Sequence, residues 1–79
     1  MDRRYRVSHH SREGDELELI LDYTIYTLHL SLIITDNGED FYINEHIFFS
    51  PEGEDMEMEL KRDHRQDITR EFYELEIML

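Results

Sequence analysis

The feature that most constrains this chain is the dipeptide Asn37-Gly38, which lies between two apolar, β-rich runs. The run YTLHLSLIIT precedes it closely and the run DFYINEHIFF follows it. A type I′ turn needs φ > 0 at both central residues, and Asn-Gly meets that need better than most pairs. The sequence therefore predicts a β-hairpin from Tyr26 to Phe49 with a two-residue loop.

The loop also predicts which residues face each other across the hairpin. One face is apolar and pairs Ile34 with Phe41, Leu32 with Ile43, Leu28 with Ile47, and Tyr26 with Phe49. The other face is mixed and pairs Ile33 with Tyr42, Ser31 with Asn44, His29 with His46, and Thr27 with Phe48. Leu30 would meet Glu45 on the apolar face. Either a bulge moves Glu45 outward, or that end of the face is open to solvent or a partner.

Two segments precede the hairpin. Residues 1–12 form a basic arm, or Tyr5 to His10 form a short first strand. Apolar residues alternate from Glu16 to Tyr23 and favour a strand over a short helix that begins at Asp15. This segment has apolar residues at odd positions, whereas the hairpin's first strand has them at even positions. We therefore expect a bulge or sharp bend near residues 22–25.

Three segments follow the hairpin. A turn at residues 50–54 contains Pro51 and Gly53. The alternation from Asp55 to Lys61 predicts another strand, and residues 62–67 read as a polar connection. Ile68 to Leu79 fits a strand by its tight alternation, and it also fits a helix capped by Asp67. We favour the strand.

These patterns predict one small domain over residues 1–79. Its expected class is mainly β, an antiparallel meander of four to five strands around the central hairpin, with room for one short helix. A chain of this size buries only about 60–65% of its unfolded surface, so a homodimer would add to a thin stability margin.

The charge is the most distinctive property of the composition. Twenty Asp and Glu against eight Lys and Arg give a formal net charge of −12. Residues 1–12 hold four arginines and one aspartate, which is +3, so residues 13–79 carry −15. Such a body repels nucleic acid and anionic membranes, and it attracts basic surfaces across about one Debye length, roughly 8–10 Å at physiological salt.

Acidic residues alternate with apolar ones in three predicted strands, so their carboxylates should project to solvent. Neighbouring carboxylates on one strand face are about 6.8 Å apart, which is of the same order as the distance between successive phosphates on a nucleic-acid strand. A surface that mimics a nucleic-acid backbone and a solvated face that keeps the protein soluble are both consistent with this pattern. The residues predicted to bind a partner are Glu16, Glu18, Asp22, Asp55, Glu57, Glu59, Glu74 and Glu76.

Other classes of function have less support. The chain has no cysteine, no Gly-rich phosphate loop and no nucleophile motif, so we expect no enzyme and no cofactor. His29 and His46 could share a metal ion if they face each other, but two ligands make a weak site. The aromatic residues on the less apolar faces are either interface anchors or a second small core: Tyr42, Phe48, Phe72 and Tyr73. The N-terminus lacks the apolar stretch of a signal peptide, so a cytoplasmic location in a host cell is expected.

The preferred function is a non-enzymatic acidic protein that occupies the basic groove of a nucleic-acid-binding protein. No direct binding to nucleic acid or membrane is expected. In size and charge the chain is similar to the small acidic inhibitors that phages and mobile elements make against restriction or CRISPR systems. The similarity lies in composition alone, and no residue roles are carried over. The alternative is a homo-oligomeric assembly module whose charge serves solubility.

Overall fold

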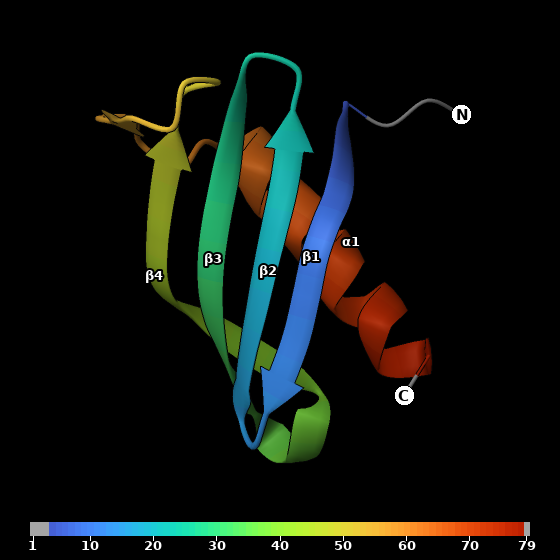
Figure 1. Cartoon of the computed structure of the whole chain (residues 1–79). Helices are drawn as coiled ribbons and strands as arrows, with labels where there is room; N and C mark the ends of the chain where they lie inside the picture. Colours follow the sequence, from blue (N-terminus) through green and yellow to red (C-terminus); the bar gives the residue numbers. More distant parts are fainter. Residues whose placement is uncertain (1–3, 79) are drawn as a thin grey trace.

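The computed structural model describes residues 4–78 of the backbone and the side chains of residues 4–75. It is a five-stranded antiparallel sheet in the order β1-β2-β3-β4-β5, with one helix packed across one face (Figure 1). The elements are β1 (Tyr5–Glu13), β2 (Glu16–Tyr23), β3 (Tyr26–Thr35), a short 3₁₀ turn η1 (Asp36–Gly38), β4 (Asp40–Phe49), β5 (Asp55–Met56) and α1 (Arg62–Met78). The predicted mainly β meander with one helix is confirmed.

The central residues of the β3–β4 turn have the predicted geometry, but the loop is longer than the predicted two residues, because Asp36, with φ 53°, and Glu39 lie outside the strands. Asn37 has φ 56° and ψ 33°, and Gly38 has φ 93°. The amide of Glu39 donates a hydrogen bond to the carbonyl oxygen of Asp36 over 3.1 Å. These are the features of a type I′ turn. Next to the turn, the predicted pairing of Leu32 with Ile43 and of Ile34 with Phe41 is confirmed.

A bulge on β4 changes the register farther from the turn. The pairing shifts between Ser31 and Leu32, so that Asn44 is the extra residue and Glu45 faces Ser31 on the outer face. The bulge alternative for Glu45 is therefore confirmed. All predicted pairs beyond it are wrong by one residue: Ser31–Asn44, His29–His46, Leu28–Ile47, Thr27–Phe48 and Tyr26–Phe49. The shift brings Phe48, rather than Ile47, to the core opposite Leu28.

The strands before the hairpin agree with the sequence prediction, with one difference in length. β1 pairs with β2 along its whole length from Tyr5 to Glu13, so the described part of the arm is a strand. Between β2 and β3 the expected bend is a tight turn in which Tyr23 faces Tyr26. This turn pairs odd-numbered β2 positions with even-numbered β3 positions, and both sets of leucines therefore reach one core.

The strand favoured for the C-terminal segment is wrong, and the helix alternative is right in type, although the helix begins earlier than Ile68. Residues 62–78 form helix α1, so neither the polar connection at residues 62–67 nor the strand from Ile68 exists. The strand predicted from Asp55 to Lys61 is also too long, because only Asp55 and Met56 pair with β4. The chain leaves the sheet there to cross to the helix, although Met58 and Leu60 still pack against the core.

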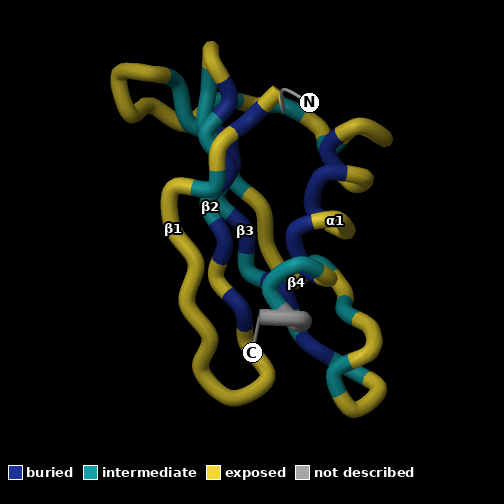
Figure 2. The backbone as a smooth tube through the Cα atoms, turned by 90° about the vertical axis from the view of Figure 1, so that its right-hand side faces the viewer, coloured by how far each residue is buried: buried dark blue, intermediate teal, exposed yellow. Residues whose placement is uncertain are grey.

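The core lies between the sheet and α1. Its largest fully buried side chains are Phe48, Phe72, Leu19, Leu21, Leu28, Leu32 and Ile68. The rings of Phe72 on α1 and Phe41 on β4 are 4.6 Å apart. Figure 2 shows that the buried positions of β2, β3 and α1 face one another, while most of β1 is exposed. The opposite face, here called the outer face, is toward the viewer in Figure 1, and no helix formed by the described residues covers it. Within residues 4–78 no helix is long and apolar enough to cross a membrane.

Candidate functional site

Acidic side chains are concentrated at the β4–β5 side of the sheet. Residues 36–60 hold nine Asp and Glu and no Lys or Arg, so this segment accounts for nine of the twelve net negative charges. All nine side chains are exposed. We call this surface the acidic edge: Asp36, Glu39, Asp40, Glu45, Glu52, Glu54, Asp55, Glu57 and Glu59.

The fold keeps the acidic edge open. β5 pairs only with Phe48 and Phe49. Among the described residues, therefore, no strand pairs with residues 40–47 of β4 on the edge that faces away from β3. Within residues 4–75, none of the nine carboxylates forms an ion pair with a basic side chain. Like charges on neighbouring backbone positions repel each other. The edge is therefore a region of strong negative potential with no ion-pair partner among the described basic side chains.

The eight residues predicted to bind a partner fall into three places. Asp55, Glu57 and Glu59 lie on the acidic edge. Glu16, Glu18 and Asp22 lie on the outer face of β2, which β3 separates from β4. Glu74 is half-buried on α1, and Glu76 is in the same helix with its side chain outside the described residues. The prediction that Glu74 and Glu76 project from a strand is wrong.

The carboxylates of β2 differ from those of the acidic edge because β1 supplies partners for two of them, and one of these partners is an arginine. Arg6 Nη2 lies 3.2 Å from Asp22 Oδ2. His9 Nε2 lies 3.9 Å from Glu18 Oε2, and the Ser11 hydroxyl donates to the same carboxylate over 3.4 Å. The negative potential of β2 is therefore partly compensated within the chain.

The β4 bulge separates the two histidines that the sequence pairs. His29 faces Ile47 on the outer face, whereas His46 faces Leu30 on the helix side of the sheet. The predicted His29–His46 pair is therefore wrong, and the two imidazoles cannot share one metal ion. Among the described residues no group of three or more His, Asp or Glu side chains is arranged to hold a metal.

A second polar feature lies between α1 and the sheet. His64, Asp67 and Glu71 are buried at spacings of three and four residues, which places them on one side of the helix. They meet tyrosines at the neighbouring ends of β3, β2 and β1. We call these contacts the tyrosine network, and its members are Arg4, Tyr5, Tyr23, Tyr26, His64, Asp67 and Glu71.

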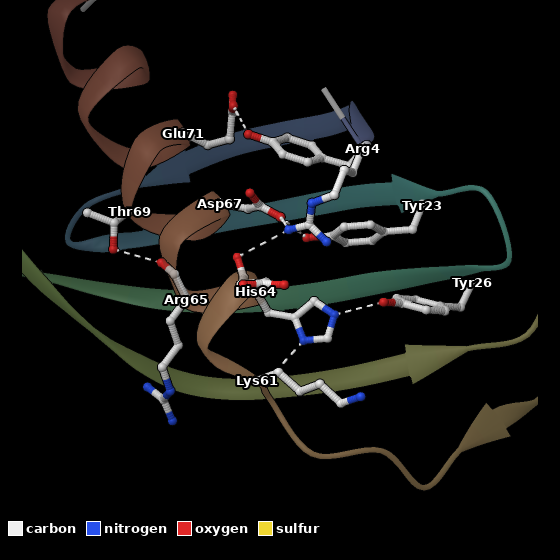
Figure 3. A network of polar contacts seen from close by, with 11 residues as sticks. Arg4, Tyr23, Tyr26, Lys61, His64, Arg65, Asp67, Thr69 and Glu71 are labelled. Carbon is white, nitrogen blue, oxygen red and sulfur yellow. Dashed lines mark hydrogen bonds and ion pairs between the residues drawn. The ribbon is translucent and has the colours of Figure 1, made fainter. Parts of the chain in front are cut away.

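Each tyrosine of the network has its own partner on the helix (Figure 3). The Tyr5 hydroxyl donates to Glu71 Oε2 over 2.5 Å, and the Tyr23 hydroxyl donates to Asp67 Oδ2 over 2.7 Å. Arg4 Nη2 donates to the same Asp67 oxygen over 2.6 Å.

The third tyrosine contact involves His64 at the beginning of the helix. The Lys61 amide donates to His64 Nδ1 over 3.0 Å, so the side chain of the third helical residue caps the residue that precedes the helix. In the neutral ring the proton is then on Nε2, which lies 2.8 Å from the Tyr26 hydroxyl and donates to it.

Burial changes the acidity of the groups in this network. Burial and the hydrogen bond to Glu71 raise the pKa of Tyr5 to about 12. Burial, and then the contact with Asp67, raise the pKa of Tyr23 further. Burial also raises the pKa of Tyr26 and lowers the pKa of His64. At neutral pH the phenols are therefore protonated donors and His64 is neutral.

The tyrosine network fixes the helix on the sheet rather than offering a reactive group. No buried side-chain nitrogen or oxygen in the described part of the chain lacks a hydrogen-bond partner. A satisfied buried network specifies one position of the helix along the strands. The sequence analysis missed the tyrosine network. A helical spacing of the residues that face the sheet could have revealed it, and these residues are His64, Asp67, Ile68, Glu71, Phe72 and Leu75.

No protein-family model, no curated protein and no solved structure matches the chain.

Proposed function

We propose that the protein is a non-enzymatic inhibitor that uses its acidic edge to occupy the positively charged groove of a nucleic-acid-binding protein. The observation that carries the proposal is the concentration of nine exposed, unpaired carboxylates in residues 36–60 without one Lys or Arg. A groove that binds phosphates offers the complementary charge.

The geometry of the edge suits such a groove. From Asp55 to Leu60 exposed carboxylates alternate with half-buried apolar residues, so Asp55, Glu57 and Glu59 point away from the core. In extended chain the repeat of such side chains is about 6.8 Å, of the order of the phosphate spacing. Met56, Met58 and Leu60 attach this segment to the core and hold the carboxylates in place.

The cost of this arrangement also supports the proposal. Solubility alone needs a net charge of magnitude roughly 2–8 in a small domain, with both signs interspersed. Here the charges are segregated, because the described basic residues lie on β1, next to it, or from Lys61 onward. A segregated edge repels itself in the free protein, and a basic partner would relieve that repulsion.

The first experiment is affinity capture from cell lysate at low and at high salt, followed by identification of the bound proteins. The expected partner is a nucleic-acid-binding protein whose capture falls steeply with salt. Binding is then measured in competition with DNA or RNA that the partner recognises. A partner that holds nucleic acid and this protein at the same time would contradict the proposal.

Charge reversal locates the binding surface. Glu57→Lys with Glu59→Lys should slow association with the captured partner more than Glu16→Lys with Glu18→Lys. The two pairs carry the same charge change, but only the first pair lies on the acidic edge, and Glu18 accepts a hydrogen bond from the Ser11 hydroxyl. All four side chains are exposed, so circular dichroism should show both variants folded. Equal association rates for the first variant and the parent would rule out the acidic edge.

A homo-oligomeric assembly module is the second candidate, because no helix or strand within residues 4–78 covers the outer face. That face includes Tyr42, which is 56% exposed. Sedimentation equilibrium over a wide concentration range separates the two functions. A stable oligomer that captures no basic partner would favour the assembly module.

A further inference from the structure

The outer face has a hollow at its centre, lined by residues of β2, β3 and β4 and by His9 of β1, whose Nε2 lies 3.9 Å from Glu18 Oε2. Its volume is about 210 Å³. Two rows of residues that face each other across the strands line it. One row is largely apolar and the other is polar: Ile20, His29 and Ile47, then Glu18, Ser31 and Glu45.

The β4 bulge creates the polar row. Without it Asn44 would face Ser31, and Glu45 would point to the core side. With it, the short side chain of Ser31 lies between two glutamates whose Cα atoms are two strand spacings apart, roughly 9.5 Å. Both carboxylates are exposed at the rim, so the hollow has a negative opening.

The apolar row supplies a different kind of surface. Ile20 and Ile47 are half-buried although no helix covers them. His29 lies between them, and its ring is held edge-on against Phe49 with centroids 4.6 Å apart. The hollow therefore offers aliphatic walls, one oriented aromatic ring and two carboxylates within the reach of a single side chain.

We propose that the hollow binds one arginine side chain of a basic protein segment; this inference rests on the proposed function and names the group by which the partner is anchored. The aliphatic stem packs on Ile20 and Ile47, and the guanidinium lies over Ser31 between Glu18 and Glu45. A planar group with five donors can bond carboxylates on both sides and stack on the His29 ring, which the compact ammonium of lysine cannot do. The charge of −12 attracts such a segment from a distance.

The test is an NMR titration with N-acetyl-arginine methylamide. The control ligand is N-acetyl-citrulline methylamide, which has nearly the same shape and no charge. The Ile20 and Ile47 methyl signals and the Ser31 amide signal should shift and saturate with the arginine compound only. N-acetyl-lysine methylamide should bind more weakly than the arginine compound, because it cannot stack or bridge.

Two variants locate the binding. Glu18→Gln with Glu45→Gln should weaken arginine binding roughly fivefold, as expected for two exposed ion pairs. Ser31→Leu should abolish it by filling the hollow, and Ser31 is half-buried on the outer face, so the fold should tolerate it. The matched control is Glu13→Gln with Glu16→Gln, an exposed pair on the same face beyond the hollow. It should change the affinity less than twofold.

Three results would overturn the arginine site. These are equal shifts with the citrulline compound, equal weakening in the matched control, or signals of Tyr42 and Ile47 that move with protein concentration before ligand is added. The last result would mean that a second copy of the chain covers the hollow.

Failure of the arginine site is distinguishable from failure of the proposed function. If arginine does not bind but Glu57→Lys with Glu59→Lys still slows partner association, only the hollow is wrong. If arginine binds at the hollow but the captured partner also holds nucleic acid, only the mimicry is wrong.

Discussion

Replacing Tyr23 with phenylalanine isolates one hydroxyl at the centre of the tyrosine network. That hydroxyl donates over 2.7 Å to Asp67, whose side chain is 5% exposed. A hydrogen bond to a charged group contributes about 1.5–3 kcal/mol, compared with about 0.5–1.5 kcal/mol for a neutral pair. Arg4 stays beside Asp67, so the carboxylate is not left without a partner. We therefore expect Tyr23→Phe to lower the free energy of unfolding by about 2 kcal/mol.

Tyr26→Phe is the matched control for this change. It removes the same atom from the same network, but its partner is the neutral ring of His64. The expected loss is about 1 kcal/mol. For a domain of this size each kcal/mol lowers the melting temperature by roughly 4–8 °C, so the two variants should be separable by calorimetry.

A double-mutant cycle tests the charge directly. In an Asp67→Asn background the Tyr23 hydroxyl has only a neutral acceptor, so Tyr23→Phe should then cost about as much as Tyr26→Phe does in the parent. Urea unfolding followed by circular dichroism gives the free energies of unfolding of the parent, the two single variants and the double variant. If Tyr23→Phe costs no more than Tyr26→Phe, or costs the same in both backgrounds, the contact with Asp67 has no special strength and the reasoning fails.

Three further predictions concern other parts of the fold. Gly38→Val places a β-branched residue at φ 93°, so it should destabilise the protein by more than about 1 kcal/mol, whereas Asn37→Gly should be nearly neutral; thermal unfolding of both measures this. Phe72→Ala removes a 1% exposed ring and should cost about 3–5 kcal/mol in urea unfolding, while Tyr73→Ala, at an exposed position, should cost far less. Stability should also fall at both ends of the pH scale. The unfolded chain takes up a proton below pH 6.5 that native His64 resists, and it loses protons above pH 10 that native Tyr5 holds to about pH 12. Urea midpoints that stay flat from pH 4 to 7 would contradict the first part, and those that stay flat from pH 9 to 12 would contradict the second.

Sequence predicted the sheet well because its signals are local. Asn37-Gly38 fixes a turn, and the leucines of β2 and β3 alternate without interruption. The β4 bulge was one of two predicted alternatives, because a regular hairpin would place the Glu45 carboxylate beside Leu30 on the apolar face, and burying an unpaired carboxylate costs free energy. The alternation of apolar residues did not show which residue of β4 would be the extra one, and the structure places the bulge at Asn44.

The helix was missed for a physical reason. Half of its buried side consists of His64, Asp67 and Glu71, which a search for apolar periodicity counts as surface residues. Their partners are tyrosines on three different strands, so the burial becomes favourable only in the assembled fold. Meanwhile Tyr73 and Leu75 satisfy a period of two, and Leu75 also lies on the buried side of the helix.

The candidate site was predicted only in part, because the charge of a residue is visible in the sequence whereas its partners depend on the fold. Asp55, Glu57 and Glu59 are acidic wherever the chain places them, so the sequence alone identified these three residues of the acidic edge. The compensation of Asp22 by Arg6 depends on the pairing of β1 with β2, which the sequence left open. Structure therefore separates two groups of acidic residues that look alike in the sequence.

The order of the elements along the chain has a consequence for biosynthesis. Every strand pairs with its neighbour in sequence, so the hairpins can form while the chain is still leaving the ribosome. The helix that covers their leucines is made last, and Glu71 meets Tyr5 across 66 residues of chain. Until residues 62–78 emerge, the nascent sheet presents a bare apolar surface. A premature stop codon before the helix would thus release an aggregation-prone fragment rather than a smaller folded protein.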